Sequence, residues 1–361
     1  MLTTFFLVWG AMWAIYFVLD GFDLGAGGMI LRVAKSPEDR KTIVNSVGPV
    51  WDGNEVWLIA AGAFTFGAFP IAYAAMFSTL YTPLMLLLFA LIMRGVSFEF
   101  RGKFSDAGAG LMWDRVLAIS SLLAALLLGV AFANLFRGIP VEILPADAAG
   151  LTPLAVGADG TGYIYSGTLS LFNGYGLLGG VLFVVMFLLH GALWIAKKTT
   201  GELHDRSAAC ARRLWFVVAV VTVSFLVYTW FDTQLFDNYL ANPVLFILPV
   251  CAVVGLVGML VNILKNDHVK AWFFSAGFIL FVAVFGVVGL YPNIFPYRFE
   301  GKLLADASLS LFNAASTPRT LVIMLIIAAV ILPIVVLYQI WAYRLFWGKL
   351  KASDFEGRQS Y

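Results

Sequence analysis

The stretch TFFLVWGAMWAIYFVLDGFDLGAGGMIL, residues 4–31, decides the fold of this chain. Apart from two aspartates it holds no charged residue, and a transmembrane helix needs about 20 mostly apolar residues. The first basic residue is Arg32, so the run lacks the basic segment that opens a cleavable signal peptide, and it is longer than the core of such a peptide. We therefore predict a retained first membrane-spanning helix.

The whole chain has the composition of a membrane protein. Of its 361 residues, 61% are hydrophobic and 12% are charged, whereas a soluble domain carries roughly 25% charged residues. The fold class is therefore an all-α polytopic membrane protein of about nine transmembrane helices. The apolar runs predict spans at 4–31, 51–69, 71–93, 113–136, 168–196, 213–231, 243–264, 270–291 and 320–347.

The basic residues predict the orientation of these helices, because Lys and Arg are retained on the cytoplasmic side. With the N-terminus outside, nineteen of the 23 basic residues fall in cytoplasmic segments. The outer segments then hold Arg137, Arg298, Lys302 and Arg319. Omitting the span at 51–69 would reverse every later loop and destroy this asymmetry. The pattern predicts nine spans, with the N-terminus outside and the C-terminus in the cytoplasm.

The two long outer connections, about 137–167 and 292–319, are rich in Gly, Pro and Asp. This composition predicts loops with short helical turns. The formal net charge is +2, and no basic tract indicates nucleic-acid binding.

Two aspartates inside the first span are candidates for function, because an ionisable group in the membrane costs about 2.5–3.5 kcal/mol on the insertion scale. Asp20 and Asp23 are spaced i, i+3 and share one helix face. Counting from an outer end near residue 5, they lie roughly 22 and 27 Å down a hydrocarbon core of about 30 Å. Both are therefore expected in the cytoplasmic half. The glycines of this stretch are expected to let another helix approach closely.

A second group of polar residues opens the next span, in GPVWDGNEVWL at 48–58. In the simplest interpretation, Asp52 caps the helix and Glu55 completes its first turn, since carboxylates favour the positive end of the helix dipole. However, two tryptophans and the amide of Asn54 surround Asp52, which is more than a cap requires. We therefore treat Asp52, Asn54, Glu55 and Trp57 as candidate site residues.

The third candidate stretch is RGVSFEFRGK at 94–103. Arg94 is expected near the inner leaflet, where it either pairs with an intramembrane carboxylate or extends to the interface. Glu99, close to Arg101 and Lys103, has the pattern of a solvated helix end.

Histidine is scarce, which bears on redox cofactors. His190 is at membrane depth, whereas His204 and His268 fall in cytoplasmic loops. A six-coordinate haem usually needs two axial His or Met ligands, and a lone buried His more often makes a helix–helix hydrogen bond. No Cys/His clustering indicates a metal site. The residues alone thus predict a transporter, a channel or an accessory subunit without a redox centre of its own.

Several of these stretches resemble subunit II of the bd-type quinol:oxygen oxidases. The resemblance is carried, in the same order and spacing, by GFDLGAGG at 21–28, GPVWDGNEVWL at 48–58, RGVSFEFRGK at 94–103, GVAFANLFRGIP at 129–140 and TGELH at 200–204. It extends over essentially the whole chain, and the WDGN block is its most specific part.

The resemblance implies two four-helix bundles plus one peripheral helix. Residues 1–140 would form the first bundle and 168–291 the second. Residues 141–167 and 292–319 would be periplasmic loops, and 320–361 would be the peripheral helix with a cytoplasmic tail.

The resemblance also implies partners and cofactors. In that family, subunit I carries two haems b, one haem d and the quinol site, while subunit II binds no haem. The complex oxidises quinol, reduces dioxygen to water and takes protons from the cytoplasm. This chain would lie in a bacterial or archaeal cytoplasmic (inner) membrane, among lipid, beside subunit I and small single-span accessory subunits. Whether a quinone is bound in this subunit stays open.

Residue by residue, the resemblance assigns no catalytic group to this chain. Asp52 matches a carboxylate on the proton route to the oxygen-reducing haem. Glu99 matches a second acid on that route, where Asp is more usual. Independently of the resemblance, we expect the buried pair Asp20 and Asp23 to extend the candidate path. Trp57 matches the entry of an oxygen channel. Structural polar roles go to Arg94, Glu55, Asn54 and His190.

A different class of protein also fits these residues. A stand-alone proton- or ion-coupled secondary transporter would use the buried Asp20, Asp23 and Asp52 as ion sites. It would behave as a homo-oligomer and bind a solute alone, whereas an oxidase subunit would be stable only with a larger, haem-bearing partner.

The uneven distribution of Lys and Arg between the two sides of the membrane allows a direct test of topology. A reporter fused after Tyr361 should be found in the cytoplasm, and one inserted near Gly157 should be found in the periplasm. The reason is that nineteen basic residues retain their segments on the cytoplasmic side. Activity of alkaline phosphatase and fluorescence of a green fluorescent protein fusion measure the two sides. Both reporters on one side of the membrane would contradict nine spans.

Overall fold

The computed structural model describes residues 1–103, 107–144 and 153–350. Long helices form most of it: α1 (Leu2–Val33), α3 (Trp51–Ala68), α5 (Tyr81–Arg101), α6 (Ala107–Arg137), α7 (Gly174–Lys198), α8 (Gly201–Asp232), α10 (Ile247–Leu264), α11 (His268–Leu290) and α12 (Pro318–Leu345). Short helices join them: α2 (Pro37–Val47), α4 (Pro70–Thr79), α9 (Asp237–Ala241) and the 3-10 turns η1 (Thr168–Leu171) and η2 (Pro243–Phe246).

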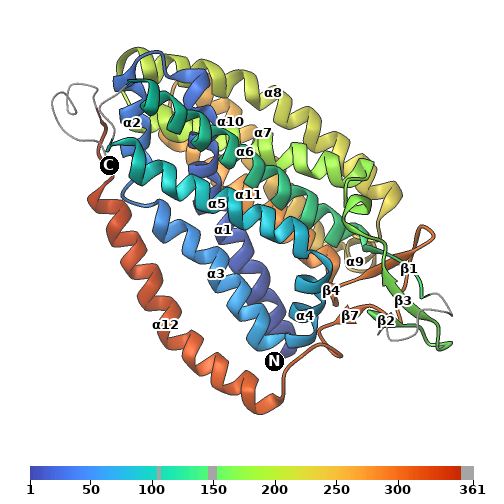
Figure 1. Cartoon of the computed structure of the whole chain (residues 1–361). Coiled ribbons are helices and arrows are strands. Elements are labelled where there is room, and N and C mark those ends of the chain that lie inside the picture. The colour runs from blue at the N-terminus through green and yellow to red at the C-terminus, as the bar shows by residue number, and fades with distance from the viewer. Residues whose placement is uncertain (104–106, 145–152, 351–361) are drawn as a thin grey trace.

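Within the described ranges, eight helices are long and apolar enough to cross a membrane. Helix α3 is not among them, because the polar residues of WDGNE in its first turns lower its mean hydropathy. Nevertheless, α3 runs antiparallel to α1 along most of its length. Asn54 near the start of α3 bonds to Asp23, and Thr65 near its end accepts a hydrogen bond from Trp9. Helix α1 begins at one end of the helix bundle, and helix α12 ends at the opposite end (Figure 1).

The predicted span at 71–93 is wrong in position. The apolar run is interrupted at Leu80, so that residues 70–79 form the short helix α4 and the long helix α5 begins only at Tyr81. Pro70 occupies the first turn of α4, where its missing N–H costs nothing. Because the side chains on both sides of the break are apolar, hydropathy could not locate it. The other predicted spans overlap the helices that the structure places there.

The two long connections contain short strands, which the prediction of loops with short helical turns did not include. A five-stranded sheet has the order β2 (Ala155–Val156), β3 (Gly162–Tyr165), β1 (Ile139–Ile143), β5 (Tyr297–Phe299) and β6 (Lys302–Leu303). A second pair joins β4 (Asn293–Phe295) and β7 (Leu309–Ser310). Strand β1 pairs with β5 in parallel, so the connections cover each other at one end of the helices (Figure 1). Isolated apolar fragments of two to five residues carry no clear alternation, which is why the pattern was missed.

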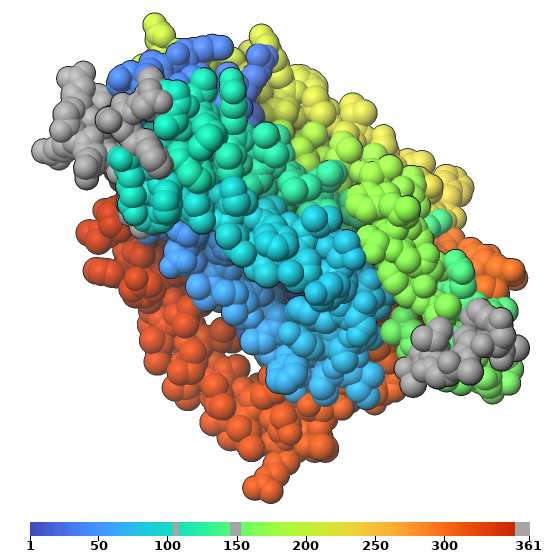
Figure 2. Space-filling view, viewed as in Figure 1, coloured from blue at the N-terminus to red at the C-terminus, as the bar shows by residue number. Residues whose placement is uncertain are grey.

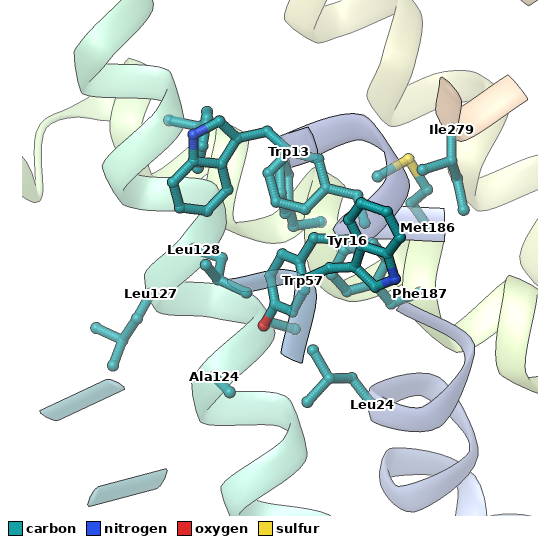
Figure 3. Packing of buried hydrophobic residues seen from close by; sticks show 14 of the residues in the cluster. Trp13, Tyr16, Leu24, Trp57, Ala124, Leu127, Leu128, Met186, Phe187 and Ile279 are labelled. Atoms are coloured by element: carbon teal, nitrogen blue, oxygen red, sulfur yellow. The ribbon is translucent and has the colours of Figure 1, made fainter. Parts of the chain in front are cut away.

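Helix α1 lies at the centre of the protein and packs against α3, α6, α7 and α11. Figure 3 shows Trp13 and Tyr16 of α1 among side chains of α6, α7 and α11, such as Leu128, Met186 and Ile279. Buried side chains from α1 to α12 join one large hydrophobic cluster. The division into two four-helix bundles therefore stays a prediction, and residues 351–361 of its last segment lie outside the described part of the chain.

Helix α12 is peripheral, and among its residues only Leu321 is buried. Figure 2 shows this helix along one margin of the molecule, beside α3. A cavity of about 710 Å³ lies between the C-terminal half of α12 and the facing side chains of α1, α3 and α11.

The backbones of α1 and α7 touch at two glycines. A Cβ atom on Gly25 would lie 1.8 Å from the carbonyl oxygen of Phe187, and one on Gly191 would lie 2.2 Å from the backbone N of Ala26. Both distances are far below a van der Waals contact, so no side chain fits there. Helix pairs in membranes use small residues for this close approach. The glycine-rich stretch predicted such a contact, although its partner Gly191 was not identified.

This contact predicts a sharp difference between two glycines. Gly25→Ala should lower the thermal stability of the detergent-purified protein by several degrees, because α1 and α7 must separate to admit the methyl group. Gly277→Ala is the matched control, since a Cβ there meets nothing within 4 Å, and it should leave the melting temperature unchanged or slightly higher. Equal melting temperatures for both variants would show that the backbones do not touch.

Candidate functional site

Arg94 lies at the centre of a buried ionic cluster between three helices. Its Nη1 donates to Oδ1 of Asp20 on α1 at 2.6 Å, and its Nη2 donates to Oε2 of Glu55 on α3 at 2.7 Å. The side chains of Arg94 and Asp20 are fully buried, and that of Glu55 is 22% exposed. Arg94 therefore does not extend to the membrane surface. Glu55 does more than complete a helix turn, so that interpretation of it is wrong.

A second polar chain begins three residues further along α1. Oδ2 of Asp23 accepts a hydrogen bond from Nδ2 of Asn54 at 2.6 Å. Oδ1 of Asn54 in turn accepts two hydrogen bonds from α12, one from Nε2 of Gln339 at 2.9 Å and one from the hydroxyl of Tyr343 at 2.8 Å. Nε1 of Trp57 donates to Oε1 of the same Gln339 at 2.7 Å. The WDGN segment thus joins the centre of the protein to its peripheral helix.

Asp52 and Glu99 lie outside this buried cluster. Helix α3 begins at Trp51 without a side-chain cap hydrogen bond, and its N-cap residue is Val50, so the interpretation of Asp52 as a cap is wrong. Both Asp52 and Glu99 are exposed. The ring of Trp51 stacks on that of Phe98 with 5.3 Å between centroids, which places the start of α3 beside the end of α5. The two exposed carboxylates therefore lie at the same end of these helices.

His190 is fully buried and joins three helices. Its Nε2 donates to the carbonyl of Val18 on α1 at 3.1 Å, its Nδ1 contacts the hydroxyl of Ser275 on α11, and its ring stacks on Trp272. Both ring nitrogens are engaged in the protein, so an axial bond to haem iron would break one of these contacts. Among the described residues, no group of three or more His, Cys, Asp and Glu side chains is placed to hold a metal ion. His190 therefore does not fit the role of an axial haem ligand.

The structure brings together five residues that were singled out from the sequence, Asp20, Asp23, Asn54, Glu55 and Arg94. Two further members of the cluster, Gln339 and Tyr343, were not identified from the sequence. Both lie in the span predicted at 320–347. A Gln within an otherwise apolar span is a weak signal, because a polar group in the membrane usually has a partner there. Its partner is almost 300 residues away in the chain and could only be identified from the packing.

Comparisons with known proteins agree over nearly the full length. A family model described as cytochrome bd terminal oxidase subunit II matches residues 1–346. A curated protein of Escherichia coli strain K12, cytochrome bd-I ubiquinol oxidase subunit 2, is 31% identical, over 97% of this chain and 95% of its own. Cytochrome bd ubiquinol oxidase subunit 2 of Bacillus subtilis strain 168 is 32% identical, over 94% of each.

The fold of this chain also matches a solved structure. A chain in the structure of bd oxidase from Geobacillus thermodenitrificans superposes with a TM-score of 0.71 at 15% identity, covering 95% of this chain and 98% of that one. At this identity the match establishes the fold alone.

The ion pairs of Arg94 predict strong coupling between distant residues. Arg94→Gln should lower the melting temperature of the purified protein markedly, because removing one partner of a buried pair costs about 3–5 kcal/mol. The double variant Asp20→Asn with Arg94→Gln should lose less than the two single variants together, by about 0.5–3 kcal/mol. Thermal unfolding in detergent measures all four proteins. Lys270→Gln is the control, since this lysine side chain is 70% exposed and pairs with Asp267 outside the cluster, so its loss should cost little. Strict additivity of Asp20→Asn and Arg94→Gln would contradict the pairing.

Proposed function

Because the chain belongs to the cytochrome bd terminal oxidase subunit II family, we propose that it is the haem-free subunit of a quinol:oxygen oxidoreductase. In this proposal it stabilises a haem-bearing subunit I, which holds two haems b, one haem d and the quinol site, and it contributes a proton path from the cytoplasm. The engaged ring nitrogens of His190 support the haem-free assignment. Small accessory subunits and a bound quinone belong to the same proposal.

The proposed topology has nine spans in the cytoplasmic membrane: the eight apolar helices and, in addition, α3. Helix α3 supports this count because it runs beside α1 from Asn54 to Thr65. With an odd number of crossings, α1 would begin on one side of the membrane and α12 would end on the other, and the positions of these two helix ends at opposite ends of the bundle support this (Figure 1). The excess of basic residues at the α2 end supports a topology with the N-terminus outside and the C-terminus in the cytoplasm.

The observation that carries the proton path is the row of carboxylates from the end of α5 into the centre of the protein. Asp52 and Glu99 are exposed at the end that we assign to the cytoplasm, Glu55 is partly exposed, and Asp20 and Asp23 are fully buried. Oxygen reduction consumes protons in a water-poor interior, so each proton must arrive through groups that can bind and release it. A graded series from exposed to buried acids provides such groups.

We also propose that Trp57 lies at an entry for dioxygen. Trp57 lines the cavity between α12 and the centre of the protein, together with apolar side chains such as Ile15, Leu19 and Ile340. Dioxygen is apolar and partitions into the lipid phase, which α12 faces. The hydrogen bond from Trp57 to Gln339 fixes the indole ring at the wall of this cavity.

The proton path predicts a specific defect for Asp52→Asn. The substitution keeps the shape of the side chain but removes its ability to ionise, so turnover should fall by about tenfold or more, while haem content and assembly stay normal. Asp52→Glu should retain part of the activity. Quinol-dependent oxygen consumption and proton uptake by the purified complex measure the effect.

The control for this test is Glu202→Gln, which removes an exposed carboxylate from the first turn of α8. It should leave turnover unchanged. Normal oxygen consumption and proton uptake in a fully assembled Asp52→Asn complex would remove this residue from the proposed path.

A further inference from the structure

Asp20 and Asp23 differ sharply in their surroundings, although they are three residues apart on α1 and both fully buried. Asp20 pairs with the guanidinium of Arg94, whereas the hydrogen bond to Asp23 comes from the neutral amide of Asn54. We infer that Asp23 holds the transferable proton of this cluster, and that Asp20 is a fixed counter-ion. The role of Asp23 in turnover rests on the proposed function, whereas its protonation does not.

The charge balance around Asp23 carries the first step. The charged and titratable groups that face it are Asp20 on its own helix, Glu55 on α3, Arg94 on α5 and Tyr343 on α12. Asp20 and Glu55 together already outnumber the single positive charge of Arg94. An ionised Asp23 would add a second uncompensated negative charge inside the membrane, which is costly. When carboxylates share one site, the member without a cation is the one that takes the proton.

Glu55 is not an equal competitor for this proton. Its Oε2 lies 2.7 Å from Nη2 of Arg94, and its side chain is 22% exposed, so both the guanidinium and water stabilise its ionised form. Asp20 is held in the same way by Nη1 of Arg94 at 2.6 Å. Protonating either acid would weaken an ion pair, whereas protonating Asp23 weakens none.

The amide of Asn54 determines which oxygen of Asp23 carries the proton. Because Oδ1 of Asn54 accepts from both Gln339 and Tyr343, its Nδ2 group must face Asp23. Oδ2 of Asp23 is therefore an acceptor, and the proton belongs on Oδ1. Within the described residues Oδ1 of Asp23 is buried and has no hydrogen-bond partner. In the same part of the chain Oδ2 of Asp20 also has no hydrogen-bond partner, but the other oxygen of Asp20 faces a guanidinium, whereas Asp23 receives only a neutral amide. An ionised Asp23 would therefore be the less compensated of the two carboxylates.

The transfer itself involves one proton and no electrons. The O–H bond at Oδ1 of Asp23 breaks as the proton leaves toward the site where oxygen is reduced, and the resulting carboxylate takes up another proton from the cytoplasmic side. Asp20 cannot do the same work at low cost, because each cycle would break and remake its ion pair with Arg94. Gln339 and Tyr343 act as positioning residues, since they hold Asn54 with its NH2 group toward Asp23.

The two aspartates allow a matched experiment on the assembled complex. Asp23→Asn imitates a neutral carboxyl group, so the melting temperature should stay unchanged. Asp20→Asn removes the charge that faces Arg94 and should lower it by about 5 °C or more. In infrared difference spectra between the oxidised and reduced complex, the carbonyl band of a protonated carboxylic acid that shifts in heavy water should be lost in Asp23→Asn and retained in Asp20→Asn. Asp23→Glu should restore the band and part of the activity.

The outcomes separate this inference from the proposed function. Loss of stability or of assembly in Asp23→Asn, or persistence of the infrared band in that variant, would overturn the assignment of the proton to Asp23. A stable Asp23→Asn complex that lacks the band and loses oxygen consumption by about tenfold or more would support both claims. If the same complex kept full oxygen consumption and proton uptake, Asp23 would still be the protonated acid, but the proposed path through it would be wrong.

Discussion

The burial of the Arg94 guanidinium among carboxylates fixes how helices α1, α3 and α5 are oriented relative to one another. Removing Arg94 from water is costly, and only well-placed charged partners offset that cost. Those partners come from two other helices, Asp20 on α1 and Glu55 on α3. The three helices therefore must lie at fixed rotations relative to one another, because a turn of any of them would leave a charge unpaired in the membrane. Apolar contacts between helices would by themselves allow larger shifts and rotations of one helix against another than these ion pairs do.

Helix α1 carries two kinds of constraint along its length. Its acids face α3 and α5, while Gly25 faces α7 so closely that backbone atoms touch. The contact at Gly25 sets the distance between the axes of α1 and α7, and the ion pair of Asp20 with Arg94 sets the rotation of α1 about its own axis. Between α1, α7 and α11, the hydrogen bonds of His190 add a third connection. A single central helix thus positions the polar cluster relative to the rest of the protein.

Polar contacts attach the C-terminal half of the peripheral helix α12 to the rest of the protein. Most of its surface is apolar and exposed, as suits a helix that faces lipid, and its inner half borders a cavity of about 710 Å³. Gln339 and Tyr343 attach it to Asn54, and Nζ of Lys198 on α7 donates to backbone carbonyls just beyond its end. These contacts let α12 cover the acid cluster without filling the space beside it. The same contacts orient the amide that faces Asp23.

The sequence by itself determined the class of fold, because about 60% apolar composition and runs of about 20 apolar residues are compatible only with lipid as the main solvent. It also identified Asp20, Asp23, Glu55 and Arg94 as exceptional, because any charge inside such a run needs a partner. What only the tertiary structure decided is which charges meet. The break at Leu80, the strands of the two long connections and the contacts of Gln339 all depend on residues far away in the chain. The sequence shows that a charged residue lies in an apolar segment and must be costly to bury. Which partner offsets that cost depends on hydrogen bonds shorter than 3 Å between side chains of separate helices, and these follow only from the tertiary structure.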